Sequence, residues 1–561
     1  MSNNDDLAQY SERADFLENG ELADWTVDHE YFRFIQKKVT QSGAKLLVGP
    51  RGSGKTHHFR YAHQRCQGKS DAPLTIYVSF TRYYHLEPYL REASEAVQIF
   101  HSWVLAKILN SMSTDYPEQY SQVINGIEAL EKEKLDAFIA AAERGRDPSA
   151  IDKEGEKYTI SVVVNVAEKI MTLLSRKRIV LMLDDAALVL TPEYMVEFFD
   201  IFRSLKTSKI SPKASVYPGT TEYGPRFHAD HDAEKVAAWL DVNDSGYIGF
   251  MESIARDRLK LSKKELSPDL LTAIAYASFG VPRAFITMVR SYMESDASQK
   301  QQRFNLMIRS HVEFRKTEYL SLAEKTPQYR DIISVGWKLF DKIVETATKT
   351  TLELKGIEKN VQIGILRDFD SKCERMIRFL IEAGLLFQLP SVSHGADREY
   401  LRFIPHYAFL IDRRAFSPGK GWSPQKMVER IELPEKKHPI RRQLSSLLEG
   451  SDMARIELNL PPCKSCGAER ISAHQSYCHQ CGNKLIESSI FEACMGIKVE
   501  NLPITENQKR RIINETDIRT LGDIVSSPDP ASELRKAKSI GKKRAQRIYV
   551  LAKSVEEEFF S

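Results

Sequence analysis

Long apolar stretches are absent from this sequence of 561 residues. No run approaches the roughly 18 consecutive apolar residues that a helix needs to cross a bilayer. The first residues, MSNNDDLAQY, are acidic and polar, unlike the basic and then apolar start of a secretory signal. These absences argue against a membrane protein or a membrane partner, and they favour a soluble protein in the cytoplasm.

The sequence also has few cysteines and a small net charge. The chain has seven cysteines, and four of them cluster late in the sequence, which indicates a metal site rather than a disulfide framework. The formal net charge is +4, too small for the whole surface to attract nucleic acid, so any basic patch must be local. The length predicts about three to five domains.

The segment LLVGPRGSGKTHHFR carries the first motif. Its central residues fit G-x-x-x-x-G-K-[ST], and they are Gly49, Pro50, Arg51, Gly52, Ser53, Gly54, Lys55 and Thr56. An apolar strand precedes this loop and a helix follows it, which makes a chance match in a surface loop less plausible than a phosphate-binding loop. Lys55 would reach the β- and γ-phosphates of ATP, and Thr56 would bind Mg²⁺.

The segment RIVLMLDDAALVL supplies two carboxylates after a buried strand. Asp184 is the expected Mg²⁺ partner, and Asp185 lies where a water-activating carboxylate, often glutamate, would be. Aspartate is one methylene shorter than glutamate, so the sequence leaves open whether the Asp185 carboxylate reaches the attacking water. The alternative is a solvated pair at the end of a strand.

Short apolar strands alternate with long helical stretches from residue 31 to residue 240. The strands are expected at Lys45–Val48, Leu74–Phe80, Arg178–Leu183 and Ala214–Tyr217. This alternation predicts a parallel sheet with both faces covered by helices. The charged helical stretch from Glu118 to Lys157 is expected to be an insertion in this α/β core.

Two further segments place polar groups near the expected nucleotide. In PGTTEYGPRF, Thr220 or Thr221 lies at the end of a strand, where a hydroxyl can contact the γ-phosphate or position water, and Arg226 follows closely. In FGVPRAF, proline begins a helix and Arg283 can direct its guanidinium back to the nucleotide. The alternatives are a surface arginine for Arg226 and a helix-capping salt bridge for Arg283.

The order of these motifs resembles that of the AAA+ ATPases, over roughly the first half of the chain. It looks most like the branch of origin-recognition and initiator ATPases and their relatives among the STAND signalling ATPases. The resemblance implies an ATPase with Thr220 or Thr221 as sensor 1, Arg283 as sensor 2 and Arg226 as a candidate arginine finger, acting in cis or in a neighbouring subunit of a homo-oligomer. It also implies a helical lid over residues 241–312. Ala186 and Ala187 stand where the branch has a further acidic residue, so the resemblance does not predict how fast ATP is hydrolysed.

A winged helix is expected over residues 313–416. In DSKCERMIRFLIEAGLLFQL, the apolar residues Met376, Ile377, Leu380 and Ile381 form one helical face, and Lys372, Arg375 and Arg378 lie largely on another. Leu385–Leu389 and Tyr400–Ile404 could pair as the wing. Such a module can place its helix in the major groove of DNA, but Glu374 and Glu382 dilute the basic face, and the alternative is an internal packing or oligomer domain.

Four cysteines lie between residues 458 and 486, after a predicted linker over 417–457. Cys463, Cys466, Cys478 and Cys481 form two C-x-x-C knuckles, each followed by glycine, which predicts a closed structural Zn²⁺ site that resembles a short zinc ribbon. A dithiol redox pair would need only one such knuckle. His474 and His479 are alternative ligands that the site does not require, and Cys66, Cys373 and Cys494 are expected to be ordinary thiols.

The last segment, 495–561, resembles a helix-hairpin-helix domain of the kind found beside recombinases and repair enzymes. Between Leu534 and Val555 it contains eight lysines and arginines and no acid. The expected DNA contacts are Gly541, Lys542, Lys543, Arg544 and Arg547, where glycine makes the turn and the following helix N-terminus faces a phosphate. Such contacts favour duplex DNA with little sequence specificity, and the alternative is a solvated helix face or a protein-docking module.

These segments together predict an α/β P-loop AAA+ core with a helical lid, followed by a winged helix, a small zinc ribbon and an all-α helix-hairpin-helix domain, and preceded by a charged segment over residues 1–30. The expected cofactors are ATP, Mg²⁺ and Zn²⁺. The expected function is an ATP-driven switch or oligomeric machine that engages DNA. The alternative is a signalling or scaffold ATPase, for example in antiviral defence, whose C-terminal modules bind a protein effector.

Overall fold

The structure is a computed structural model of the chain. It describes residues 19–560 except 81–82, 88, 90–94, 145–147, 186–191, 222, 262–264, 396–397, 418–420, 457–461, 464, 472–474, 476, 484, 486–489, 528 and 539. Ala186, Ala187, His474, Ser539 and the first 18 residues of the predicted N-terminal segment therefore lie outside the described residues. In the described part, none of the helices combines the length and apolar character that crossing a membrane requires.

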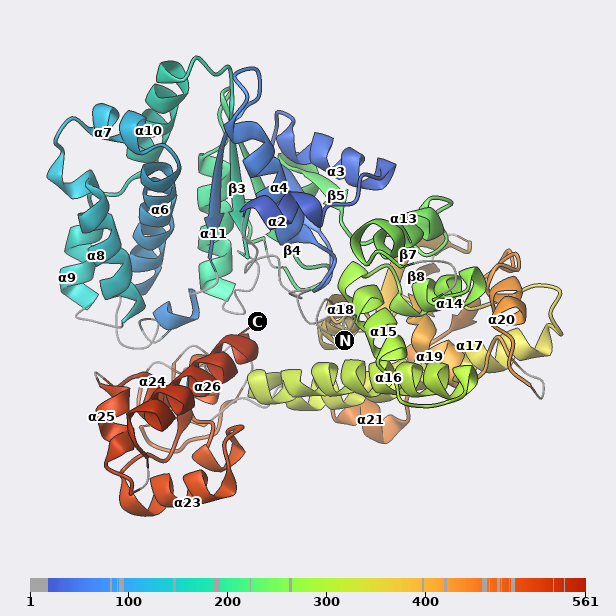
Figure 1. Ribbon diagram of the computed structural model, residues 1–561. Helices are drawn as coiled ribbons and strands as arrows, with labels where there is room; N and C mark the ends of the chain where they lie inside the picture. Colours follow the sequence, from blue (N-terminus) through green and yellow to red (C-terminus); the bar gives the residue numbers. More distant parts are fainter. Residues whose placement is uncertain are drawn as a thin grey trace.

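A parallel sheet of five strands forms the centre of the N-terminal half, in the order β2-β3-β4-β1-β5 (Figure 1). The strands are β1 (Lys45–Val48), β2 (Leu74–Ser79), β3 (Ile179–Asp184), β4 (Ile210–Val216) and β5 (Glu234–Ala237). This confirms the predicted parallel α/β fold. The edge strand β5 was not expected, because only one of its four residues is buried and it carries no apolar run.

Helices cover both faces of this sheet, as the continuously apolar strands require. One face packs against α3 (Glu30–Thr40) and α4 (Lys55–Gln67), and the other against α6 (Ala96–Asp115), α10 (Ile160–Leu173) and α11 (Pro192–Ser204). Along β3 the side chains alternate between the two cores: Val180 and Met182 join the first, and Ile179, Leu181 and Leu183 join the second. The short helix α2 (Asn19–Asp24) precedes α3.

A helical segment is inserted between β2 and β3, and it extends beyond the expected 118–157. Besides α6 and α10 it contains η2 (Tyr83–Leu86), α7 (Pro117–Ile124), η3 (Glu128–Leu130), α8 (Lys132–Glu143) and α9 (Pro148–Gly155). These helices form the lobe on the left of Figure 1. Their buried apolar residues are continuous with the core of the sheet, so the insertion is part of the same folded body.

The short helix α12 (Ala229–Asp232) lies between β4 and β5, and a series of helices follows β5. They are α13 (Tyr247–Ser253), the π-helical η5 (Ile254–Arg258), α14 (Pro268–Ser278), α15 (Pro282–Met293) and α16 (Lys300–Lys325). The helix α16 is 26 residues long and runs without a break through residue 312, where the expected lid ends. It therefore connects the helices of the predicted lid directly to the next part of the chain.

The α17–β9 unit, residues 330–442, has a sheet of its own in the order β7-β8-β6-β9. Its elements, which the 3-10 turn η6 (Pro327–Tyr329) precedes, are α17 (Arg330–Glu353), β6 (Ile363–Leu366), α18 (Ser371–Glu382), β7 (Leu386–Ser393), β8 (Glu399–Pro405), α19 (Tyr407–Asp412), α20 (Pro424–Ile431) and β9 (Ile440–Arg442). The strands β7 and β8 form the antiparallel hairpin that the sequence predicts. The segment expected to be a linker instead contributes α20 and β9, because Met427, Val428 and Ile431 are buried and β9 pairs with β6.

The C-terminal helical unit, residues 490–560, packs against two earlier parts of the chain. Its elements, which follow η7 (Leu444–Ser446) and α21 (Gly450–Ala454), are α22 (Ile490–Met495), η8 (Val499–Asn501), α23 (Glu506–Glu515), α24 (Leu521–Val525), α25 (Pro530–Arg535) and α26 (Lys542–Phe560). The amide of Phe491 donates to Glu87 Oε2 (3.0 Å), and Lys325, at the end of α16, lies 5.5 Å from the ring centre of Phe559. Figure 1 shows this unit beside the end of α16.

Lys213 is the more deeply buried of two buried lysines in the first sheet. Lys213 of β4 is 1% exposed, and its Nζ donates to the carbonyl oxygens of Gln41 (2.8 Å) and Gly43, which follow α3. Burial lowers the pKa of Lys213 to about 7, and the charges of Lys45 and Arg178 add to that effect. The amino group thus satisfies two carbonyl oxygens that follow the C-terminal end of α3.

We predict that Lys213 makes stability depend on pH. The unfolded chain keeps this proton up to about pH 10.5 and the folded chain releases it near pH 7, so the unfolded state binds more protons between these values. The free energy of unfolding should therefore rise with pH in this window, by at most about 1.4 kcal/mol per pH unit. Urea unfolding at pH 7, 8 and 9 should show a smaller slope for Lys213→Met than for the wild type. Equal slopes would contradict the prediction, whatever the absolute stability of the variant.

Candidate nucleotide site and metal centre

The loop between β1 and α4 is a tight concave turn that glycine makes possible. Gly52 and Gly54 have φ values of +79° and +89°, in the left-handed region that other residues rarely adopt. A Cβ on Gly49 would lie 2.5 Å from Ser53 Oγ, so a side chain cannot fit there. Ser53 Oγ is itself buried and has no hydrogen-bond partner in the described part of the chain. An unpaired buried hydroxyl inside a glycine turn fits a bound oxyanion.

Lys55 points into this loop. Its Nζ donates to the carbonyl oxygens of Gly49 (2.6 Å) and Pro50 (3.1 Å), and it lies 4.1 Å from the ring centre of Tyr217. Burial lowers the pKa of Lys55 to about 7, although the nearby carboxylates of Asp184 and Asp185 act in the opposite direction. The ammonium group is therefore poorly compensated in this environment, and a phosphate would supply the missing negative charge.

The two carboxylates lie at the end of β3. Asp184 is fully buried, and its Oδ2 accepts a hydrogen bond from the Tyr77 hydroxyl (3.0 Å). The amide of Asp185 donates to Ser215 Oγ (3.0 Å), and Asp185 has a φ of +56°, an uncommon value for a residue with a side chain. Such strained positions concentrate at functional sites. Sequence reasoning did not anticipate Tyr77 and Ser215, because polar residues within strands carry no motif.

The geometry distinguishes the two threonines that follow β4. Thr221 is buried, and its hydroxyl donates to the carbonyl oxygen of Tyr217 (2.9 Å), so it serves the turn itself. Thr220 instead lies near Glu382 of the α17–β9 unit, where it favours the ionised form of that carboxyl. Because β4 lies between β1 and β3 in the sheet, this loop lies between the glycine turn and Asp184.

The two arginines occupy different environments. The amide of Arg283, in the first turn of α15, donates to the carbonyl oxygen of Gly52 (3.3 Å), and a Cβ on Gly52 would lie 2.9 Å from Arg283 Cβ. The helix α15 thus begins directly on the glycine turn. The structure pairs Arg226 with Asp200 of α11 (3.3 Å), and the Arg226 side chain is 74% exposed. Arg226 is therefore a surface residue in this conformation of the chain.

The basic side chains of the predicted winged helix and those of the predicted helix-hairpin-helix lie in different environments. On α18, Arg375 donates to the Tyr329 hydroxyl (2.6 Å), and Arg378 pairs with Glu374 (2.7 Å), so both cations are engaged within their own unit. At the start of α26, Lys542, Lys543, Arg544 and Arg547 are all exposed.

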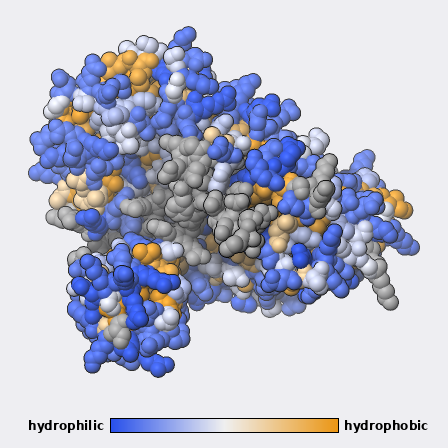
Figure 2. Space-filling view, in the orientation of Figure 1, coloured by the Kyte–Doolittle hydropathy of each residue, from blue (hydrophilic) through white to orange (hydrophobic). Residues whose placement is uncertain are grey.

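Gly541 precedes α26 and accepts a hydrogen bond from the amide of Ala545 (3.0 Å). No atom lies within 4 Å of the position its Cβ would take, and its φ is not positive. The backbone conformation at this position therefore does not require glycine, and the missing side chain leaves the backbone open. Figure 2 shows a largely hydrophilic surface on this unit, at the lower left.

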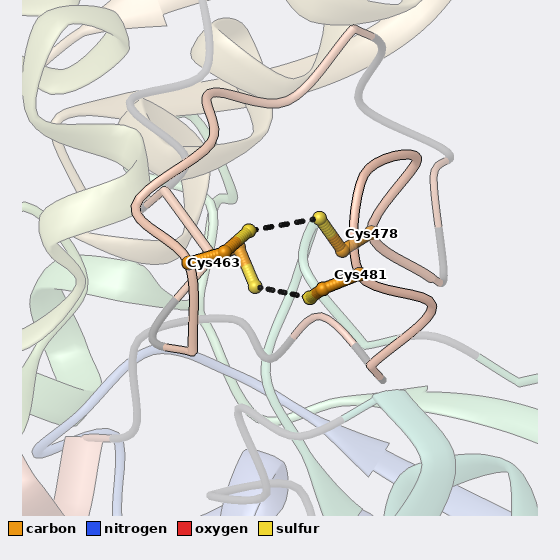
Figure 3. A group of neighbouring side chains, drawn as sticks. Cys463, Cys478 and Cys481 are labelled. Carbon is orange, nitrogen blue, oxygen red and sulfur yellow. Dashed lines mark hydrogen bonds between the residues drawn. The ribbon is translucent and has the colours of Figure 1, made fainter.

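The four clustered cysteines form a group that could hold a metal ion. Their sulfur atoms all lie within 4.8 Å of one another, and Cys463–Cys481 and Cys466–Cys478 are each 3.5 Å apart. Figure 3 shows the two knuckles facing each other. The backbone N–H of Cys466 lowers the pKa of Cys463 to about 6, because it stabilises the thiolate that a metal requires.

The turn after each knuckle is made by a glycine with positive φ, Gly467 (+73°) and Gly482 (+71°). Their amides donate to the carbonyl oxygens of Cys463 and Cys478, which closes each knuckle. His479 faces Gln475 (3.5 Å) rather than the sulfurs. The three remaining cysteines, Cys66, Cys373 and Cys494, are buried at separate places in the fold.

The fold of the N-terminal half is an α/β architecture: a five-stranded parallel sheet with a glycine turn between β1 and the helix that follows. No protein-family model and no curated protein matches the sequence. Among solved structures the chain is similar to the Aeropyrum pernix Orc1 protein in complex with DNA, with 15% identity over 71% of this chain and 94% of that chain. The TM-score is 0.29, so this likeness carries no information on site residues or partners.

We predict that the protein, purified without chelators, contains about one metal ion per chain, because four thiolates at these distances complete a tetrahedral site. Elemental analysis by mass spectrometry should show this metal, and Cys463→Ser should lose most of it. Cys66→Ala, which removes a buried thiol outside the group, should keep it. A metal-free wild-type protein would contradict the assignment.

Proposed function

We propose that this chain is an ATP-dependent switch of the AAA+ type whose output is the engagement of duplex DNA. The observation that carries the proposal is the meeting of three parts of the chain at one place. The glycine turn of residues 49–56, the carboxylates at the end of β3 and the first turn of α15 lie around one position. The charges of Asp184, Asp185 and Arg283 all act on the pKa of Lys55. A nucleotide bound there would contact the sheet and the helices α13–α16 at once.

The residues have complementary roles in this proposal. Lys55 and the amides of the glycine turn bind the phosphates, while Thr56 and Asp184 hold Mg²⁺, which neutralises charge on the transferred phosphoryl group. Asp185 orients the attacking water, with Thr220 beside it. Arg283 reports the presence of ATP to α15, so that nucleotide exchange changes how α13–α16 lie on the sheet. Arg226 is exposed on the surface, and in this proposal it leaves Asp200 to contact the nucleotide of a neighbouring copy of the chain.

Two modules of the C-terminal half would complete this function. Zn²⁺ is the metal we propose for the four thiolates, and it would fix a segment too small to bury a sufficient core. The exposed start of α26 is the proposed DNA contact. Its unpaired helix amides and the surrounding cations suit a phosphate and carry little information about sequence.

We predict that Lys55→Ala weakens ATP binding by at least about tenfold, because it removes the cation that faces the β- and γ-phosphates. Asp185→Asn should keep ATP binding and slow turnover by about 100-fold, within the range for loss of a catalytic base. Titration calorimetry and phosphate release measure the two effects. The control is Asp136→Asn, the same change at an exposed position of α8.

Two outcomes would alter the assignment. Unchanged ATP affinity in Lys55→Ala would remove the site. If Asp184→Asn retained hydrolysis while Asp185→Asn lost Mg²⁺, the roles of the two carboxylates would be exchanged.

We predict that Lys542→Ala/Lys543→Ala/Arg544→Ala weakens duplex DNA binding about equally across sequences. The slope of log K against log salt should fall by about one unit for each DNA phosphate that the variant no longer neutralises. Filter binding at several salt concentrations, with and without ATP, measures both quantities. Lys436→Ala/Lys437→Ala/Arg442→Ala removes the same charge from exposed positions of the α17–β9 unit and should change neither.

The rival function is a signalling or scaffold ATPase. The C-terminal helical unit already packs on the body of the protein through Phe491 and Phe559, so its other surface could bind an effector protein. A triple variant that binds DNA like the wild type would favour this rival.

A further inference from the structure

The end of α18 packs directly on the nucleotide site, although it belongs to the α17–β9 unit. A Cβ on Gly219, in the loop after β4, would lie 2.8 Å from the carbonyl oxygen of Arg378. A Cβ on Gly384, just beyond α18, would lie 3.7 Å from Pro50 Cβ in the glycine turn. Both glycines have positive φ, +92° and +68°. The chain thus brings α18 against the glycine turn and against the loop that carries Thr220.

Glu382, the last residue of α18, inserts its carboxylate into this contact. It lies near Thr220 and within the electrostatic influence of Arg51, Lys55 and Lys325, all of which favour its ionised form. Its Oε2 is buried and has no hydrogen-bond partner among the residues that the structure describes. Burial raises the pKa of Glu382, although Thr220 and these cations favour the ionised form. The carboxylate is therefore held in this position at a cost in solvation.

The groups around Glu382 are those that a terminal phosphate needs. Two cations of the glycine turn and a hydroxyl at the end of a strand are the donors that bind phosphate oxygens. A carboxylate presents the same chemistry to them: negative charge and oxygen acceptors. Two anions in one small buried volume repel each other strongly, so a phosphate bound to these donors would be opposed by the ionised carboxylate of Glu382 beside them.

We propose that Glu382 occupies the position of the terminal phosphate in the nucleotide-free site, so that ATP binding displaces α18 and releases the α17–β9 unit from the glycine turn. The inference rests on the proposed ATP site and adds an internal competitor to it. ADP, which lacks the third phosphate, would leave most of the contact in place. The α17–β9 unit would then be docked without nucleotide or with ADP, and undocked with ATP.

The first test is Glu382→Gln, which keeps the shape and hydrogen-bonding capacity of the side chain and removes its charge. Affinities for a non-hydrolysable ATP analogue and for ADP would be measured by titration calorimetry. We expect the variant to bind the analogue about tenfold more tightly than the wild type, and ADP within about twofold of it. Glu374→Gln is the matched control, because it makes the same change on the same helix, where Glu374 pairs with Arg378 on the surface. It should bind both nucleotides like the wild type.

The outcomes of this test are distinct. Equal affinity of Glu382→Gln and wild type for the analogue would overturn the inference. Loss of hydrolysis at saturating ATP with unchanged affinity would also overturn it, since Glu382 would then act as a base in the reaction. A wild-type protein that binds neither nucleotide would instead refute the proposed function.

A second test uses the short distance between Pro50 and Gly384. A Cβ added to Gly384 would lie 3.7 Å from Pro50 Cβ, within the range of disulfides, and 2.8 Å from Nη2 at the flexible end of Arg315, which must shift. Pro50→Cys/Gly384→Cys should therefore form a cross-link on mild oxidation without nucleotide. The ATP analogue should slow its formation at least about fivefold, whereas ADP should slow it much less. The reduced form of the same variant is the reference for folding. Equal rates with and without the analogue would show that ATP does not displace α18.

Discussion

Backbone hydrogen bonds between β1, β4 and β3 hold the ends of three parallel strands at one edge of the sheet. Val48 pairs with Val216, and Leu183 pairs with Ala214. The glycine turn, the threonine loop and the two carboxylates each follow one of these strands, so their separation in space is set by the register of the sheet. A slip of one residue would move each side chain of β3 to the opposite face of the sheet, so that Val180 and Met182 would exchange cores with their neighbours. The packing of β3 on both faces therefore fixes the positions of the site residues before any ligand is present.

Glycine determines how closely other parts of the chain can approach this edge. Gly52 admits the first turn of α15, and Gly219 admits the backbone of α18. Any side chain at these two positions would push a helix away by contact with its atoms. In the proposed function, the same loops hold phosphate and are also the surface on which α15 and α18 rest. A phosphate bound there would therefore affect the positions of both helices, because closely packed parts cannot move independently.

The sequence predicts the parts of the structure that depend on local pattern. The glycine turn, the four apolar strands of the first sheet, the β7–β8 hairpin and the cysteine knuckles all arise from runs or spacings that can be recognised without the fold. The short polar strand β5 and the strand β9 gave no such signal, since pairing partners far along the chain stabilise them. Glu382 was treated as a charge on a helix face, and its place beside Arg51 and Lys55 follows only from how the α17–β9 unit packs on the sheet. Tyr77 and Ser215 were missed for the same reason: their hydroxyls matter because of the neighbouring strand.

The uninterrupted course of α16 has a mechanical consequence. A helix of 26 residues is about 39 Å long. Its beginning follows α15, which rests on the glycine turn, and its last residue, Lys325, lies over Phe559 of the C-terminal helical unit. A stiff rod of this length acts as a lever arm: a tilt of about 5° at one end moves the other by about 3 Å, roughly the length of a hydrogen bond. A change too small to disturb the packing of α15 would thus be large enough at the far end to make or break polar contacts there.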